Sequence, residues 1–333
     1  MRTLSPGIVF ALLTTRLVRL RFVAVVAFAF LALLASPRAI AAAGQMYWTD
    51  FIGGTIERAN LDGTDRVTLV SGLNYPHGIA LDVVNNHMYW AEYAAGAIRR
   101  ANLDGTNVVN ILTGLDGAPA GLALDLVNHR FYWTDADIRS SAIRRANLDG
   151  SDVQVVAPTW SPRDIFLATT RMYWTDWYTG TLESANLDGT DRRVLRNDLS
   201  LPYGLEVDVM HGLIYWADSG TNRIRRATLD GTDAQDVLAA NDPVALALDA
   251  QSGRLFWDEF GVPPVTIYSA NVDGGGKVAL VPDTEAPYDI TLQLVSGPPT
   301  TEDQCKNGGW ATFEFPRTFK NQGDCVQFVK TPK

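Results

Sequence analysis

Tryptophan recurs along this chain at an almost constant interval. Consecutive members of a set of six are 41 to 43 residues apart: Trp48, Trp90, Trp133, Trp174, Trp216 and Trp257. Each stands in a similar short phrase, such as MYWTD in the first copy and IYWAD in the fifth. A fixed period of this length is typical of repeat architectures, in which each copy forms one supersecondary unit. We therefore expect an array of six similar units.

Two further phrases recur in register with these tryptophans. ERANLDG and its variants follow the aromatic phrase, and PHGIALD or a variant precedes it in five of the six repeats. The phrases are short and either apolar or alternating, as strands are, and Asp-Gly marks a hairpin turn. A fourth apolar run, VTLV in the first repeat, follows the turn. Four short strands in each ~42 residues predict a propeller blade. The predicted fold is an all-β, six-bladed propeller over residues 44–295.

The order of the phrases at the two ends indicates how the ring closes. The first repeat begins at Met46 with the aromatic phrase and lacks an inner strand before it. The missing phrase follows the sixth repeat as PYDITLQ. The last blade is therefore expected to combine Pro287–Gln293, as its innermost strand, with three strands from Met46–Ser71. Such a ring has no open sheet edge.

Across Gln45–Leu294 the three phrases together resemble the low-density-lipoprotein receptor class B repeat, also called the YWTD repeat. The resemblance implies a six-bladed propeller that is closed by strands from both ends. In a propeller, the loops that enter each innermost strand lie on the same face as the loops between second and third strands. In the receptors of this family, that face resembles a docking platform for protein ligands.

Residues 1–43 are expected to form a secretory signal peptide. Arginines without acidic residues come first, an unbroken apolar run (Phe22–Ala35) follows, and small residues come next. An uncleaved anchor is the alternative, although the run is shorter than the ~20 residues of a membrane span. The formal charge is −9, and it becomes −14 without residues 1–43, which hold five arginines and no acid. We therefore expect a secreted or cell-envelope protein that does not bind nucleic acid and has no membrane span after cleavage.

Residues 296–302 are interpreted as a linker, and residues 303–333 as a small C-terminal cassette. The cassette holds both cysteines, Cys305 and Cys325, which are expected to form one disulfide in an exported protein. Two cysteines are too few for a zinc finger, an iron–sulfur site or a disulfide-rich scaffold. The text KNGGW…FKNQGDCV resembles a short cassette at the ends of exported bacterial proteins. A stapled hairpin and an envelope-retention or interaction tag are the two alternatives.

The repeated aromatic and acidic positions are interpreted as structural. The tryptophans are expected to pack between neighbouring sheets. The fourth position of the YWTD phrase is acidic in all six copies: Asp50, Glu92, Asp135, Asp176, Asp218 and Glu259. A ring of carboxylates could hold Ca²⁺. However, paired arginines recur at one place in the third strand and favour structural ion pairs instead; they are Arg99 and Arg100, Arg144 and Arg145, and Arg225 and Arg226. No metal or other cofactor is predicted.

The positions that do not repeat are the candidates for function. They lie in the two sets of loops on one face, and most are aromatic: Phe51, His77, Tyr93, Trp160, Arg163, Trp177, Tyr178, Tyr203, Phe260 and Tyr288. Tyr75 lies in the same loops. Aromatic side chains beside carboxylates and an arginine suit a protein or glycan partner. The alternative is that these rings pack under their own loops.

The leading interpretation is a secreted, monomeric, non-catalytic binding propeller. A Ca²⁺-dependent, lactonase-like hydrolase is the first alternative, because other six-bladed propellers have that activity. Such a site needs several Glu, Asn and Asp residues at the mouths of the inner strands, where only Asp164 and Asp289 are candidates. The sequence has no nucleophile elbow and no zinc-binding HExxH motif. A purely structural surface protein is the second alternative.

Overall fold

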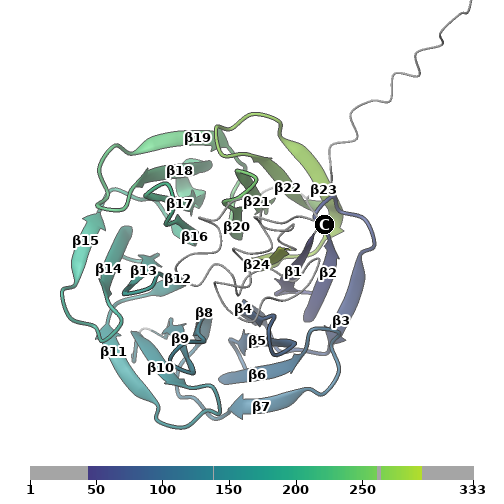
Figure 1. The fold of residues 1–333 in the computed structure, drawn as a ribbon, viewed down its shortest axis with the longest axis vertical. Coiled ribbons are helices and arrows are strands. Elements are labelled where there is room, and N and C mark those ends of the chain that lie inside the picture. Colours follow the sequence, from purple (N-terminus) through teal and green to yellow (C-terminus); the bar gives the residue numbers. More distant parts are fainter. Residues whose placement is uncertain (1–43, 138, 261–263, 295–333) are drawn as a thin grey trace, which may run out of the picture. The chain divides into compact units, whose positions relative to one another are not determined.

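The computed structural model describes residues 44–137, 139–260 and 264–294. Within these residues, the strands form six antiparallel sheets of four strands each. Figure 1 shows the sheets arranged as blades around a central channel. The predicted all-β, six-bladed propeller is thus confirmed. The predicted signal peptide, linker and cassette, with Cys305 and Cys325, lie outside the described residues.

Five blades are consecutive in sequence, and in each of them the chain order of the strands runs from the channel outward. The first has β4 (Pro76–Asp82), β5 (His87–Glu92), β6 (Ala97–Asn102) and β7 (Val109–Leu112). The second has β8 (Pro119–Asp125), β9 (Arg130–Asp135), β10 (Ala142–Asn147) and β11 (Gln154–Pro158). The third has β12 (Pro162–Leu167), β13 (Arg171–Asp176), β14 (Thr181–Asn186) and β15 (Arg193–Arg196).

The fourth has β16 (Pro202–Asp208), β17 (Leu213–Asp218), β18 (Arg223–Thr228) and β19 (Gln235–Ala239), with a short 3₁₀ turn, η1 (Ser219–Thr221), after β17. The fifth has β20 (Leu246–Asp249), β21 (Arg254–Glu259), β22 (Val265–Asn271) and β23 (Val278–Thr284). The closing blade has β24 (Pro287–Leu294), β1 (Gly44–Asp50), β2 (Thr55–Asn60) and β3 (Val67–Ser71).

The ring closes as the order of the phrases predicts. β24 pairs antiparallel with β1, so that Gly44 lies opposite Leu294 and Trp48 lies opposite Ile290. This pairing joins the two ends of the propeller in one sheet, and β24 is the innermost strand of the closing blade. None of the helical structure in the described part of the chain is long and apolar enough to cross a membrane.

The repeated NLDGT segment makes the tight turn between the third and fourth strands of a blade. In the first copy, the Gly63 N–H donates to the Asn60 carbonyl at 2.8 Å, and the Thr64 N–H donates to Asp62 Oδ1 at 3.0 Å. Gly63 has a φ of +83°, which glycine adopts without the steric cost of a Cβ atom. The turn therefore needs both residues of the Asp-Gly pair.

The repeat tryptophans fill the wedges between neighbouring blades. All six are at most 1% exposed. Trp90, for example, packs with Tyr47 and Ile56 of the closing blade and with Ile79 of its own blade. An aromatic side chain of this size buries roughly 150–250 Å². These contacts therefore contribute a large share of the cohesion between blades.

Candidate functional site

An aromatic cluster surrounds one mouth of the channel. The ring of Phe51 stacks on Tyr288 with 4.6 Å between centroids, and it lies 4.7 Å from the ring of Tyr75. The ring centroid of Tyr288 also lies 4.4 Å from that of His77 and 6.1 Å from that of Tyr203, and both ring pairs are edge to face. Because the blades converge on the channel, loops and strands distant in sequence contribute to one surface. We call it the channel-mouth cluster: Phe51, Tyr75, His77, Tyr93, Tyr203 and Tyr288.

His77 is buried within this cluster. Its side chain stacks on Tyr93 at 5.9 Å, the residue is 4% exposed, and its Nε2 has no hydrogen-bond partner among the described residues. Burial lowers the pKa of the imidazole well below its ordinary value, and the charge of Arg163 lowers it further. The ring is therefore neutral at physiological pH. The rings of Tyr93 and Tyr288 lie against His77, so its side chain offers little exposed surface, and its contact with a partner stays a prediction.

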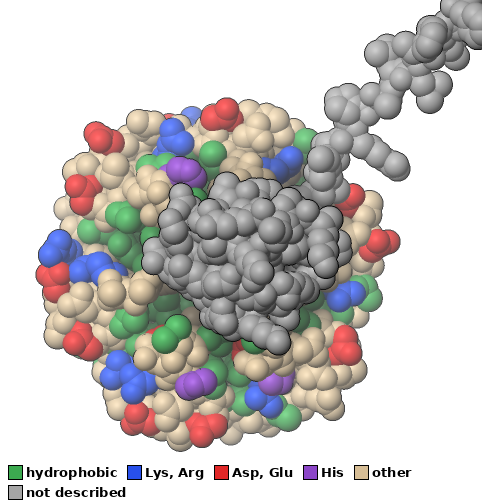
Figure 2. Space-filling model, viewed as in Figure 1, with side chains coloured by type: hydrophobic (Ala, Val, Ile, Leu, Met, Phe, Trp, Pro, Cys, Tyr) green, Lys and Arg blue, Asp and Glu red, His purple; other side chains and the backbone are tan. Residues whose placement is uncertain are grey.

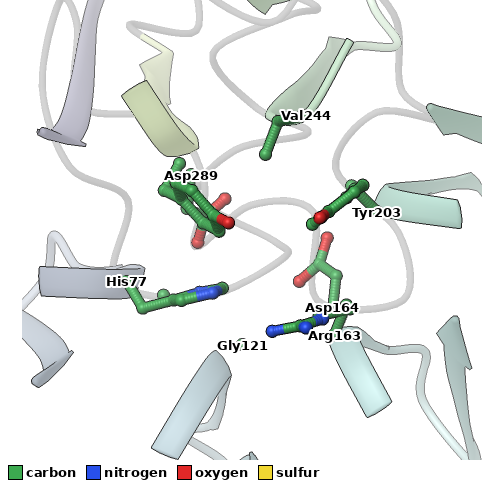
Figure 3. A pocket seen from close by; sticks show the side chains of 10 residues that line it. His77, Gly121, Arg163, Asp164, Tyr203, Val244 and Asp289 are labelled. Atoms are coloured by element: carbon green, nitrogen blue, oxygen red, sulfur yellow. The ribbon is translucent and has the colours of Figure 1, made fainter. Parts of the chain in front are cut away.

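Arg163 lies next to the channel-mouth cluster and also contacts Trp177, which is outside the cluster. Its guanidinium lies 5.3 Å from the ring centroid of Trp177 and 5.7 Å from that of Tyr203, within the range of cation–π attraction. Figure 3 shows Arg163, His77 and Tyr203 around a small pocket. The pocket has a volume of about 10 Å³, close to the space that one water molecule occupies. It is therefore too small for an organic substrate.

Trp160 and Tyr178 form an exposed aromatic pair, and Tyr178 directly follows Trp177 in the sequence. They are 64% and 70% exposed, and their ring centroids are 6.3 Å apart. The backbone under Trp160 is held firmly, since Asp176 Oδ2 accepts the N–H groups of Trp160 and Ser161 at 3.0 Å. The Thr159 hydroxyl donates to the same oxygen at 2.6 Å. The loop that carries Trp160 is therefore fixed by Asp176.

The remaining candidates of the predicted face differ in their surroundings. Trp177 is partly buried, and its N–H donates to the Ser161 carbonyl at 3.0 Å. Tyr75 is 47% exposed at the edge of the channel-mouth cluster. Phe260 follows β21 and makes no ring contact with the other candidates in the described part of the chain. Figure 2 shows acidic and basic side chains interspersed around the rim of the molecule in that view.

The six repeated acidic residues bind protein groups. Three of them form ion pairs with the arginine of the third strand: Glu92 with Arg99 at 3.0 Å, Asp135 with Arg144 at 2.9 Å and Asp218 with Arg225 at 3.3 Å. Glu259 pairs with Lys277. Asp50, like Asp176, accepts backbone N–H groups at a strand end. Among the described residues, no three His, Cys, Asp or Glu side chains are grouped so that they could hold a metal ion.

Partly buried carboxyl groups line the channel below its mouth. Asp164 Oδ2 accepts the Leu205 N–H at 2.7 Å, and Asp289 Oδ2 accepts the Ile79 N–H at 2.8 Å. Figure 3 shows both side chains pointing into the pocket. Glu206 joins them in lining a cavity of about 250 Å³ further along the channel. Glu206 was missed at the sequence level, although alanine holds the same place in the inner strands that carry Ala80, Ala123 and Ala247.

Burial raises the pKa of these channel carboxyls. It raises the pKa of Asp164 to about 7, against the opposing effect of hydrogen bonds from the Leu205 and Ile165 N–H groups. Burial also raises the pKa of Asp289 and of Glu206 well above the ordinary values, and the nearby carboxyls add to both shifts. A raised pKa lowers the fraction of ionised carboxylate, which is the form that a hard cation such as Ca²⁺ binds.

Comparisons with known proteins agree with the fold. The model of the family described as low-density lipoprotein receptor repeat class B matches residues 44–83, 86–126, 170–209 and 212–250. A solved chain titled as a nidogen/laminin complex superposes with a TM-score of 0.68 and 25% identity, covering 75% of this chain and 98% of that chain.

A gluconolactonase from Xanthomonas campestris superposes with a TM-score of 0.59, covering 74% of this chain and 87% of that chain. Its identity of 17% shows a common fold alone. No curated protein matches the chain. Together with the six blades and the repeated YWTD phrase, the matched repeats show that this chain belongs to the low-density lipoprotein receptor class B (YWTD) repeat family.

Proposed function

We propose that this chain is a secreted or cell-envelope, non-catalytic propeller that binds a protein partner through the face around the channel mouth. The observation that carries the proposal is the exposed pair of Trp160 and Tyr178, of which Tyr178 follows directly after Trp177, the ring over which Arg163 lies. Tryptophan, tyrosine and arginine are the residues that contribute most often to binding energy at protein interfaces. Leaving two large rings in water has a cost that a partner would remove.

The rigidity of this face supports the same function. Asp176 fixes the loop that carries Trp160 through two backbone N–H groups, and the guanidinium of Arg163 lies within cation–π distance of both Trp177 and Tyr203. A surface that is ordered before binding loses less conformational entropy when the partner arrives. The similarity to a propeller solved in a nidogen/laminin complex also favours a protein ligand.

A lactonase-like hydrolase is the competing function, because a gluconolactonase shares the fold. The channel mouth argues against it. Its pocket is close to the size of one water molecule, His77 is neutral and covered, and burial raises the pKa of Asp164 to about 7. Elemental analysis of the purified protein and a lactone hydrolysis assay separate the two functions. Stoichiometric calcium together with hydrolysis would overturn the proposal.

The binding proposal is tested by affinity capture from the envelope and culture fluid of the source organism, with the full chain as bait. The doubly substituted Trp160→Ala, Tyr178→Ala variant should retain its fold and bind the captured protein at least tenfold more weakly, since hot-spot truncations cost roughly 2 kcal/mol or more. The matched control substitutes Val127→Ala and Met210→Ala, two largely exposed apolar residues in turns at the opposite ends of the strands.

The control variant should capture the partner as well as the unsubstituted chain does. Equal capture by the aromatic double variant would overturn the proposed face. If capture persists after the extract is digested with protease but is lost when glycans are removed, the partner is a carbohydrate and the proposed protein partner is wrong.

A further inference from the structure

A threonine hydroxyl joins neighbouring blades at three places in the ring. In each case the Thr of the YWTD phrase donates to the carbonyl of the residue that follows the proline of the next inner strand. Thr134 Oγ1 donates to the Arg163 carbonyl at 3.0 Å, and Thr175 Oγ1 donates to the Tyr203 carbonyl at 2.6 Å. Thr49 donates in the same way to His77.

Two of these hydroxyl oxygens, those of Thr134 and Thr175, also accept a hydrogen bond inside their own blade. The Gly121 N–H donates to Thr134 Oγ1 at 2.7 Å, and the Asp164 N–H donates to Thr175 Oγ1 at 3.3 Å. Both N–H groups belong to the residue two positions after the proline of the inner strand. The threonine thus accepts from its own inner strand and donates to the next one.

In the fifth blade Asp258 stands at this threonine position, in the phrase FWDE. Asp258 Oδ1 accepts the Ala245 N–H at 2.7 Å, and Ala245 is again two positions after the proline, Pro243. The same oxygen accepts the Val244 N–H at 3.0 Å. The accepting half of the threonine pattern is therefore complete. Asp258 Oδ2 is buried and has no hydrogen-bond partner among the described residues.

The next inner strand after Asp258 is β24, which closes the ring. The residue that follows its proline is Tyr288, so the Tyr288 carbonyl is the counterpart of the carbonyls of His77, Arg163 and Tyr203. We propose that Asp258 is held as the neutral carboxylic acid, and that its Oδ2–H donates to the Tyr288 carbonyl in place of a threonine hydroxyl. The proton then completes the hydrogen bond across the seam where the two ends of the chain meet.

The surroundings of Asp258 favour the neutral form. The residue is fully buried, and burial raises its pKa to about 8 against the effect of its backbone N–H donors. The charged group facing it is Asp242, which repels a second negative charge. Tyr288 faces it from β24 with a phenol whose pKa burial raises as well. Within the described residues, no arginine, lysine or histidine forms an ion pair with Asp258.

The sign of the pH dependence follows from this pKa. The unfolded carboxyl ionises near its ordinary value of 3.8, whereas the folded one ionises at about 8. The stabilising contribution of the protonated group is complete below pH ~4 and is lost as the pH rises to ~8. Asp258→Asn cannot ionise, yet its amide N–H₂ can donate and its carbonyl can accept. Asp258→Thr restores the pattern of the other blades.

The experiment is chemical unfolding of the full chain between pH 5 and 9. The unfolding equilibrium constant of the unsubstituted protein, divided by that of the Asp258→Asn variant, should rise by up to tenfold for each pH unit until pH ~8. The Asn variant serves as the reference that cancels the titration of Asp164, Glu206 and Asp289. Asp258→Ala should be less stable than Asp258→Thr at every pH, because it loses both halves of the pattern.

A ratio that does not change with pH would overturn the proposal. Carbon NMR of the Asp258 carboxyl in the unsubstituted protein is the second measurement, and it does not depend on any variant folding. The carboxyl should remain protonated at pH 6. If the Asp258 carboxyl instead ionises below pH 5, the two backbone N–H groups stabilise a buried carboxylate and the proposal is wrong.

Discussion

A Cβ atom placed on Gly63 would lie 2.2 Å from the carbonyl oxygen of Leu280, in the outermost strand of the neighbouring blade. The same close approach recurs for the Asp-Gly glycine of each of the other five blades: Gly105 with Leu69, Gly150 with Ile111, Gly189 with Val156, Gly231 with Leu195 and Gly274 with Val237. The repeated glycine therefore serves two purposes. It makes the turn within one blade and lets that turn pack against the next.

This relationship predicts that Gly63→Ala destabilises the propeller more than its positive φ alone requires. The strained backbone conformation costs about 1 kcal/mol. The backbone must also shift to remove the clash between the new Cβ atom and Leu280, so the free energy of unfolding should fall by about 2–4 kcal/mol in total. Gly72→Ala is the matched control, since Gly72 has a φ of +75° but no atom within 4 Å of its Cβ position. Urea unfolding measures both losses. Equal losses would show that only the turn conformation matters.

The threonine hydroxyls between blades give a second prediction. Thr175→Val keeps the shape of the side chain but leaves the Tyr203 carbonyl and the Asp164 N–H without their partner. Leaving buried polar groups unsatisfied costs about 1–3 kcal/mol, so the free energy of unfolding should fall by this amount. Thr175→Ser retains the hydroxyl and should lose less than the valine variant. A valine variant as stable as the serine variant would contradict the proposed role of this bond.

The fold could be predicted almost completely from the sequence, because its determinants are local and repeat six times. The Asp-Gly turn, the buried aromatic phrase and the apolar inner strand each indicate one element, and their common period fixes the number of blades. Even ring closure could be predicted, since the first repeat lacks the strand that Pro287–Gln293 supplies. Each element is indicated by residues close together in the chain, and closure follows from comparing the first repeat with the last.

The surroundings of the site could not be predicted in the same way. His77 looks like an exposed loop residue, but Tyr93 from its own blade and Tyr288 from the other end of the chain cover it. Whether a ring is covered or free depends on contacts between blades, which the repeat pattern does not encode. Glu206 and Asp258 carried a usable signal, since each replaces a small or neutral residue at a repeated position.

Asp50 gives a prediction about the seam of the ring. Its Oδ1 accepts the N–H groups of Gly53 at 2.8 Å and Ala286 at 3.1 Å, and its Oδ2 accepts that of Glu285 at 2.9 Å. Asp50→Ala should lower the free energy of unfolding by about 2–4 kcal/mol, because it frees donors at the entry to β24. Asp62→Ala, which removes bonds only within an exposed turn, should cost about 1 kcal/mol or less. Similar losses for both variants would show that Asp50 does not secure the closing strand.

The channel carboxyls predict a loss of stability at alkaline pH. Burial and the neighbouring Asp164 and Asp289 raise the pKa of Glu206 well above its ordinary value of 4.5. The folded state therefore binds a proton that the unfolded state releases, and the contribution of Glu206 falls as the pH rises from ~4.5 through its folded pKa. Glu206→Gln removes this titration, so its stability relative to the unsubstituted chain should increase by up to about 1.4 kcal/mol per pH unit. Denaturant midpoints from pH 4 to 9 measure the difference, with Glu285→Gln at an exposed position as the control. A difference that is constant over this range, or equal to that of the control, would mean that Glu206 ionises as readily in the channel as it does in water.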